Sequence, residues 1–443
     1  MTTALLLILA LTACLGFVFL TAWKPVLGCG LFALLISLTT GLGRGTIVPL
    51  LRPNEAILLM LLAGLLIRRL GHWEQRPITS LDLALGCFAV GGIVTPALVL
   101  FVSRSPDLYS VDTLRNVLAP AQLFLVYLVF SRTPMSERER ALVLNFTMAA
   151  SIIVGLIAVA ELIDLPGVRD FIATNYPPNP VPPSWDTLYR PTSTLGHYSA
   201  VGAFGALNFL LALALATTRH PGFNRWWLSV VMAVNLVALV TSLTWAPLLV
   251  LPLATVVVLL LARHIPRELG VAVAGLALAF VLAWPSVSTR SDQQGTFQAG
   301  QVLVIPQTFQ HRMDLWQAFF MPALLDHVLV GTGTVIPSLV PDHLILFVDN
   351  EYIREGYRAG LIGIGLLLIM LGGIALAGWR ARFSPVPTIR ALGRTSLALV
   401  LFVGLIGVTA EYLFFGGVSQ EFAMIAGFLG AGAVAPISTS SAR

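Results

Sequence analysis

The sequence predicts an all-α polytopic membrane protein, for three reasons. First, the chain of 443 residues is 57% hydrophobic and only 11% charged, with a mean hydropathy of +0.87. A soluble domain carries about 25% charged residues, so only lipid could cover this much apolar surface. Second, the apolar residues are grouped in windows long enough to cross a bilayer. Third, arginine-rich clusters fall at alternate ends of these windows.

The apolar windows predict about 12–13 transmembrane helices. Roughly thirteen windows are visible, and twelve helices is the alternative because short, glycine-rich windows are ambiguous. The first window has no basic stretch before it, so we expect a membrane helix rather than a cleaved signal peptide. The windows are residues 4–22, 26–42, 55–70, 81–102, 114–131, 141–163, 197–217, 227–243, 246–262, 269–285, 358–379, 395–415 and 420–436.

Composition and missing motifs exclude several classes of function. The net charge of +5 comes without a basic tail or a dense basic patch, which argues against nucleic-acid binding. Cys14, Cys29 and Cys87 lie in apolar runs without metal-ligand spacing, so neither a disulfide framework nor a zinc site is expected. The chain has no D-x-D, Walker A, H-E-x-x-H or G-x-S-x-G motif. We therefore expect no metal ion, no nucleotide cofactor and no serine nucleophile.

The basic residues predict which helix ends share one side of the membrane. Five clusters can all face the cytoplasm: residues 68–76, 131–140, 217–225, 263–268 and 380–394. The opposite side then receives two long connections. The expected organisation is N-terminal helices 1–163, a first extracytoplasmic segment 164–196, central helices 197–285, a large extracytoplasmic loop 286–357 and C-terminal helices 358–443.

Both long segments have the patterns of ordered structure rather than of linkers. Prolines in NYPPNPVPPSWDTLYRP, residues 175–191, predict a stiff, extended path over the membrane surface. In the second segment, large apolar residues recur at helical spacing with polar residues between them. They predict an amphipathic helix at the outer interface, and they are Met313, Trp316, Phe319, Phe320 and Leu324.

Ten arginines on the predicted outer side run against the positive-inside bias, and four of them are singled out in the two long segments. These four lie beside proline, glycine or aromatic residues, and they are Arg190, Arg312, Arg354 and Arg358. Guanidinium groups make planar, bidentate contacts with phosphate oxygens and stay charged at any relevant pH. Several of them together at the outer leaflet would suit a lipid-linked diphosphate. For each arginine, contact with lipid headgroups or a salt bridge within the loops is the open alternative.

A polar stretch, VDNEYIREGYRAG, precedes the window that begins near residue 358. Asp349 or Asn350 could simply cap the N-terminus of that helix. Alternatively, Asp349 is a general base beside the arginines and takes the proton of a hydroxyl nucleophile. The glycine spacing in GLIGIG, residues 360–365, favours close helix packing.

Three motifs, in their order along the chain, resemble those of the O-antigen ligase and O-antigen polymerase superfamily. DNEYIREGYRAGLIGIG is similar to its C-terminal signature, at Asp349, Asn350, Ile353 and Gly360. HRMDLWQAFFMPALLDHVLVGTGT is similar to an Arg-x-x-x-Trp segment with a closing Gly-x-Gly, at Arg312, Trp316, Gly331 and Gly333. RPTSTLGHYS is similar to a motif at a helix start, at Arg190, Thr194, Gly196, His197 and Ser199. The resemblance covers roughly residues 185–380, and the N-terminal half matches in hydropathy alone.

The resemblance implies a GT-C-type glycosyltransferase in the bacterial inner membrane, with its active site facing the periplasm. Such enzymes transfer a glycan from an undecaprenyl-diphosphate carrier to an acceptor hydroxyl without metal or cofactor. It implies that Arg190 and Arg312 hold the diphosphate and that Asp349 is the base. Tyr352 and Trp316 offer faces for sugar stacking, and Glu411 either contacts sugar hydroxyls or pairs with an arginine. All candidate substrate-binding residues are Arg354, Arg358, Asn350, Tyr352, His197, Trp316 and Glu411.

Asp349 departs from the ligases, which have a histidine there, and favours a polymerase of surface polysaccharide repeat units. The alternative within the family is an O-antigen ligase that joins the glycan to a lipid or protein acceptor. The alternative from another class is a transporter or flippase of polyprenyl-linked glycans, although no internal repeat is visible. A non-catalytic scaffold would not explain the arginines. Expected partners are the lipid-linked donor, a glycan or lipid-linked acceptor, membrane lipids, and chain-length regulator and flippase proteins.

Overall fold

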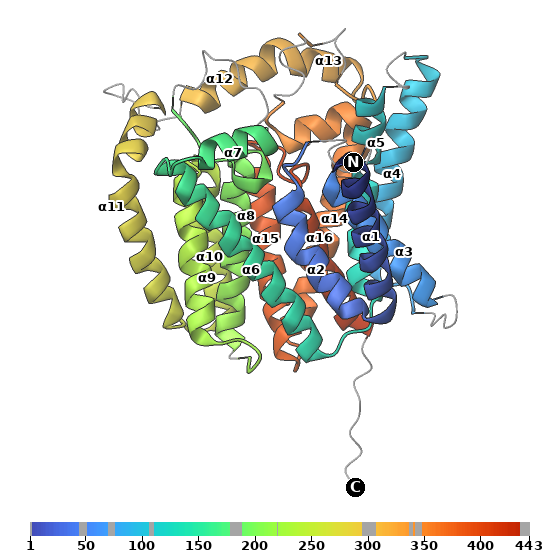
Figure 1. Cartoon of the computed structure of the whole chain (residues 1–443). Coiled ribbons are helices and arrows are strands. Elements are labelled where there is room, and N and C mark those ends of the chain that lie inside the picture. The colour runs from blue at the N-terminus through green and yellow to red at the C-terminus, as the bar shows by residue number, and fades with distance from the viewer. Residues whose placement is uncertain are drawn as a thin grey trace.

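The computed structural model describes residues 2–43, 51–69, 76–105, 110–177, 188–218, 220–294, 307–335, 340–341 and 348–434. Within these residues all regular structure is helical, as predicted (Figure 1). The α-helices are α1 (Thr2–Trp23), α2 (Pro25–Thr39), α3 (Pro53–Arg69), α4 (Ser80–Val102), α5 (Val111–Arg132), α6 (Glu137–Leu162), α7 (Val168–Asn175), α8 (Tyr198–Thr218), α9 (Arg225–Thr241), α10 (Trp245–Ala262), α11 (Glu268–Gln294), α12 (Gln307–Leu315), α13 (Met321–Asp326), α14 (Glu351–Ala381), α15 (Pro387–Ile406) and α16 (Val418–Val434).

The described helices indicate a multi-pass membrane protein. Seven of them are long and apolar enough to cross a membrane, and the bent helix α11 makes an eighth if it is one span. The seven are α4, α5, α6, α8, α10, α14 and α15. Every other predicted window also coincides with a helix, but α2, α3, α9 and α16 have 15 or 17 residues and are shorter than a full span. The expected count of about 12–13 crossings stays a prediction.

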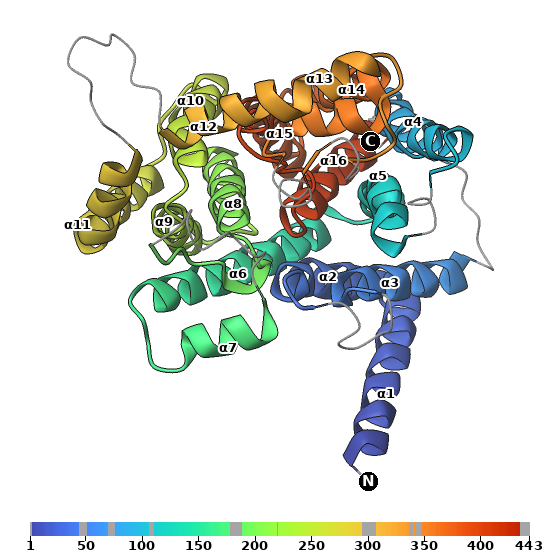
Figure 2. The same ribbon diagram turned by 90° about the horizontal axis from the view of Figure 1, so that it is seen from above.

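Helix α8 forms the centre of the bundle and is buried over its length. It packs against α9, α10 and α15, which lie near it in the view from above (Figure 2). Its residues are small or apolar on nearly every side, which is typical of a helix buried on all faces. Helix α1 projects from one edge of the bundle, and α11 lies at another edge (Figure 2).

Helix α14 starts one to two turns earlier than the apolar window predicts. It begins at Glu351 rather than near residue 358. The Asn350 side chain accepts hydrogen bonds from the backbone N–H groups of Tyr352 and Ile353. This N-cap satisfies two of the donors that a helix start leaves open. For Asn350, the structure therefore has the capping role that the sequence left as an alternative.

Helix α15 ends earlier than expected. It ends at Ile406 rather than near residue 415. The carbonyl of Gly407 accepts a 2.7 Å hydrogen bond from the N–H of Glu351, at the start of α14. The chain from 407 to 417 then passes beside the start of α14 instead of continuing as a helix.

A break in α14 lies at Ala359 and Gly360, where the backbone leaves the helical conformation. Gly360 has a φ of +61°, and a Cβ atom there would overlap the carbonyl group of Leu329. The N–H of Leu361 donates to the carbonyl of Val328 at 2.8 Å, so the chain after α13 supplies a partner at the break. The glycine run that was expected to pack helices therefore also lets a loop insert into α14.

The two ends of the bundle differ. Helices α7, α12 and α13 lie across one end, which we call the loop face (Figure 1). The five basic clusters meet at the opposite end, which we call the basic end. Four contacts join them: Arg69 to Arg132, His220 to Glu137, Arg225 to Glu268 and Thr388 to Glu137. Most of the proline-rich stretch, residues 178–187, lies outside the described residues.

Candidate functional site

Side chains from the second long loop and from the start of α14 meet at the loop face. Nε of Arg312, on α12, donates to Oδ2 of Asp349 at 2.9 Å, and both side chains are partly exposed. Asp349 directly precedes the N-cap of α14. It has a φ of +49°, a left-handed conformation that is uncommon for residues with a side chain. Two of the three residues expected to carry the reaction therefore contact each other.

Trp316 fixes the chain that leads into Asp349. Its indole N–H donates to the carbonyl of Val348 at 2.7 Å, and its ring is buried. Phe320, one turn further on, accepts a 2.7 Å hydrogen bond at its carbonyl from the hydroxyl of Tyr357 on α14. The expected amphipathic segment therefore docks on α14 through its apolar side. In this arrangement Trp316 packs the loop and does not present a face for a sugar.

Arg190 reaches the loop face from the segment between α7 and α8. Its Nη2 donates to Oγ1 of Thr244 at 3.1 Å and to the carbonyl of Leu243 at 3.4 Å. Its guanidinium carbon lies 3.2 Å from the centre of the Tyr198 ring, a cation–π contact. The turn between α9 and α10 and the first residue of α8 together hold this guanidinium group.

His197 is the last residue before α8, and the positive charges of Arg190 and Arg312 act on its imidazole. Its ring stacks on Phe415 with centres 4.6 Å apart, and its Nδ1 accepts a hydrogen bond from the N–H of Ser199. Burial, and then the positive charges of Arg190 and Arg312, lower the pKa of His197 to about 3. The imidazole is therefore neutral at neutral pH, and both guanidinium groups lie close enough to act on it.

Tyr412 lies in the segment that follows α15, and charges from the same arginines act on its hydroxyl group. Its side chain is 1% exposed, and burial raises the pKa of its hydroxyl. The charges of Arg312, Asp349 and Arg190 also act on this pKa. Three chain segments that are far apart in sequence therefore bring their charges to one place.

Arg354 and Glu411 form a second ion pair beside the first. Nη1 of Arg354 lies 2.6 Å from Oε2 of Glu411, and its guanidinium carbon lies 3.5 Å from the centre of the Phe414 ring. Burial raises the pKa of Glu411, and the charge of Arg354 opposes this. Of the two alternatives for Glu411, the structure has the pairing with an arginine.

Two further candidates serve the packing of α14. Arg358 is buried, pairs with Glu355, and donates from Nη2 to the carbonyl of Gly92 on α4 at 2.8 Å. The hydroxyl of Tyr352 donates to the carbonyl of Gly404 on α15 at 2.6 Å. Both side chains thus face neighbouring helices. They do so because α14 packs closely against α4 and α15.

Sequence reasoning missed several residues of this site. Thr244 and Leu243 lie in a short turn between two helices, where no motif marks them. Tyr198 directly follows His197, and Phe415 ends the aromatic run EYLFF. Crowded aromatic residues beside the motif positions were the only available signal.

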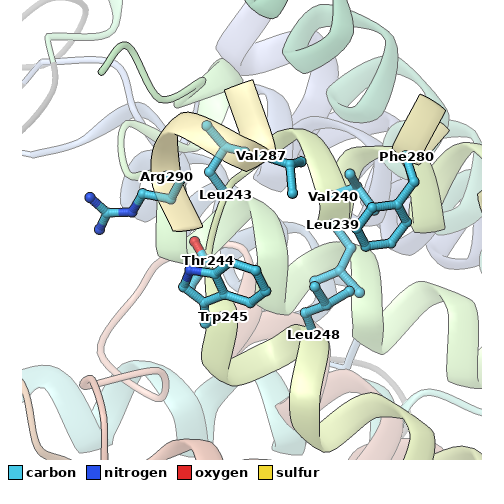
Figure 3. A pocket seen from close by; sticks show the side chains of 9 residues that line it. All are labelled: Leu239, Val240, Leu243, Thr244, Trp245, Leu248, Phe280, Val287 and Arg290. Carbon is cyan, nitrogen blue, oxygen red and sulfur yellow. The ribbon is translucent and has the colours of Figure 1, made fainter. Parts of the chain in front are cut away.

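A small apolar slot lies next to Arg190, between α9, α10 and α11 (Figure 3). Leu243 and Thr244, the hydrogen-bond partners of Arg190, also line it. Trp245 contributes a ring, and the guanidinium of Arg290 extends away from the apolar side chains (Figure 3). The slot therefore places hydrocarbon surroundings directly beside a guanidinium group.

The site thus combines two arginines from separate loops, a carboxylate, a neutral imidazole and an adjacent apolar slot. Such a set can bind an anionic headgroup and accept a proton. No protein-family model matches the chain, and a search of curated proteins finds no sequence that matches it.

Proposed function

We propose that the protein is a GT-C-type glycosyltransferase that moves a glycan from a polyprenyl diphosphate carrier to a sugar hydroxyl. The proposed product is a surface polysaccharide polymerised from repeat units, with the loop face outside the bacterial inner membrane. One observation carries the proposal. Arg190 lies over the ring of Tyr198, beside His197. Arg312, from a different loop, contacts the carboxylate of Asp349, and the charges of both arginines lower the pKa of His197. The reaction needs an anion clamp and a base, and this cluster supplies both kinds of group.

The diphosphate of the donor lipid would bind between Arg190 and Arg312. Negative charge grows on the diphosphate as its bond to the sugar breaks, and two fixed guanidinium groups stabilise that charge. The apolar side chains that line the slot beside Leu243 and Thr244 would contact the first hydrocarbon units of the carrier. The headgroup and the chain of one lipid would then have neighbouring binding regions.

Donor binding would also release the base. Without donor, the carboxylate of Asp349 is engaged by Arg312 at 2.9 Å. A diphosphate carries more charge than a carboxylate and competes for this guanidinium. Asp349 then takes the proton of the acceptor hydroxyl while the hydroxyl oxygen bonds to the anomeric carbon. The bond from that carbon to the diphosphate oxygen breaks, and its electron pair stays with the diphosphate.

Purified protein in proteoliposomes, supplied with the lipid-linked oligosaccharide of its host, tests this proposal. We expect the wild-type protein to make a ladder of products and to release polyprenyl diphosphate. Arg190→Ala, Arg312→Ala and Asp349→Ala should each lower both rates by about 100-fold or more. Arg104→Ala is the matched control, because Arg104 is an exposed arginine at the end of α4. It should keep the wild-type rates.

Wild-type product levels in all three variants would refute the proposal. A single product in place of a ladder would favour a ligase, which makes the same bond to a different acceptor. Movement of a fluorescent carrier lipid across the bilayer without new glycosidic bonds would favour the flippase class.

A further inference from the structure

Glu161 is a fully buried acid near the C-terminal end of α6. Its carboxylate accepts three hydrogen bonds from the segment that carries Arg190. The N–H of Ser193 donates to Oε1 at 2.6 Å. The N–H of Thr192 and the hydroxyl of Tyr189 donate to Oε2 at 3.1 Å and 2.8 Å. One side chain therefore binds residues on both sides of Arg190.

All three partners of Glu161 are donors, so this position requires a group that only accepts. A carboxylate offers two acceptor oxygens, whereas an amide would direct its NH₂ group at one of the donors. Ser193 has a φ of +48°, uncommon for a residue with a side chain, and its hydroxyl donates to the carbonyl of Val154 at 2.8 Å. The segment is therefore held in one particular conformation against α6.

Arg169, on α7, covers the other side of this contact. Its Nε and Nη2 donate to the carbonyls of Glu161 and Leu162 at 2.8 Å and 3.2 Å. Its guanidinium carbon lies 4.2 Å from the centre of the Tyr189 ring. Tyr189, directly before Arg190 in the chain, is thus held by α6 and α7 together.

We infer that Glu161 is a positioning residue for Arg190. It fixes the backbone on both sides of that arginine, so that the guanidinium group is held against Tyr198 and Thr244 before a ligand arrives. The inference rests on the proposed function and adds a residue that acts through Arg190 rather than on the lipid itself. A clamp arranged in advance loses less conformational freedom on binding, and it therefore binds more tightly.

Binding of undecaprenyl diphosphate to the purified full chain in detergent tests this in a double-mutant cycle, with undecaprenyl monophosphate for comparison. We expect Glu161→Gln to weaken diphosphate binding about tenfold, the size typical of losing a group that orients a ligand-binding residue. In the Arg190→Ala background the same change should cost less than about twofold. In turnover, Glu161→Gln should raise KM for the donor and leave KM for the acceptor unchanged.

Two further variants complete the experiment. Tyr189→Phe removes one of the three hydrogen bonds but keeps the ring under Arg169, so it should weaken binding about two- to threefold. Glu421→Gln is the matched control, because Glu421 is a buried acid on α16 that binds Asn208 on α8. It should bind the diphosphate like the wild-type protein. If Glu161→Gln does not fold, the test rests on Tyr189→Phe. Diphosphate binding by Tyr189→Phe as tight as that of the wild-type protein would overturn the inference.

Equal weakening by Glu161→Gln in both backgrounds would show that Glu161 only supports the fold, and it would overturn the inference. The inference would also be overturned if Glu161→Gln bound the diphosphate like the wild-type protein while Arg190→Ala did not bind it. In that case the proposed function would still stand. Wild-type binding by Arg190→Ala would instead remove the diphosphate clamp, and with it the proposed function.

Discussion

Arginines gather at both ends of the bundle, and the two groups have different partners. At the basic end, Arg132 pairs with the buried Asp82 at 2.7 Å, and the hydroxyl of Tyr127 donates to the same carboxylate. Arg69 and Arg76 donate to backbone carbonyls in the last turn of α5. These arginines complete the hydrogen bonding of a helix end.

At the loop face, two arginines have an aromatic ring as a close neighbour in addition to their hydrogen-bond partners, and at the basic end Arg382 also lies over a ring, that of Trp379. Arg190 lies over Tyr198, and Arg354 lies over Phe414. A ring covers the flat face of a guanidinium group, whereas a carbonyl engages its in-plane N–H donors. Phosphate oxygens also bind in that plane. The comparison teaches that the presence of an arginine does not reveal its role, and that the proposed anion binding at the loop face has to be argued from the partners of each arginine.

The largest effect is expected from Asp349→Asn. The amide keeps the shape of the side chain and an oxygen for Arg312, but it cannot act as the proposed base. The rate of transfer should fall by about 10²- to 10⁴-fold, while the protein stays folded. The measurement is the initial rate of carrier-lipid release in proteoliposomes. If the variant keeps more than about a tenth of the wild-type rate, Asp349 is not the base, and the carboxylate at the loop face has no chemical role that the carboxylate at the basic end lacks.

The same change at the basic end, Asp82→Asn, should act on stability instead. Both oxygens of Asp82 accept hydrogen bonds, from Arg132 and Tyr127 on one and from the N–H of Thr79 on the other. An amide cannot accept all of them, and it leaves Arg132 without its charge partner. We expect a loss of about 2–4 kcal/mol in the free energy of unfolding. Unfolding in SDS measures this, and reduced turnover per folded molecule would contradict the assignment.

Gly360→Ala tests whether the loop face depends on the break in α14. The positive φ of Gly360 and the overlap of a new Cβ with Leu329 should cost about 1–3 kcal/mol. Gly365→Ala is the control, because a Cβ there meets nothing within 4 Å. That control should change stability by less than about 1 kcal/mol. Thermal unfolding in detergent compares the two, and equal effects would mean that the break contributes nothing specific.

The smallest effect concerns the pH dependence of stability. The pKa of folded His197, about 3, lies below its ordinary value of 6.5, so at intermediate pH the unfolded chain binds a proton that the folded chain does not. The stabilising contribution is therefore complete above about pH 6.5 and is lost as the pH falls toward 3. His197→Phe keeps a ring against Phe415 and should lose less stability than wild type on going from about pH 7.5 to 5. Equal losses of thermal stability in the wild-type protein and the variant would show that folding does not keep the imidazole of His197 neutral.

The helices could be located from the sequence, but several of their ends could not. Each apolar window coincides with a helix, because lipid leaves the backbone no other way to satisfy its hydrogen bonds. The start of α14 at Glu351 and the end of α15 at Ile406 depend instead on a cap and on a bond between the two segments. Hydropathy does not register either interaction.

The candidate site was predicted only in part. The motifs named Arg190, Arg312 and Asp349, and the structure pairs Arg312 with Asp349 and places Arg190 over the ring of Tyr198. They also named Arg358, which turns toward α4 and pairs with Glu355. Residue type alone cannot tell which side of a helix will meet a neighbour, because that depends on how the whole bundle packs.

By itself, the sequence determined that the chain is helical and made for a membrane, since so many apolar side chains cannot remain in water. It also determined which side chains carry permanent charge. Only the tertiary structure decided which partners each charge has: backbone carbonyls and the buried Asp82 for arginines at the basic end, and a ring, an acid or a loop carbonyl for arginines at the loop face. The physical reason is distance, because electrostatic and hydrogen-bond energies depend on a few ångströms between groups that can be more than a hundred residues apart in the chain.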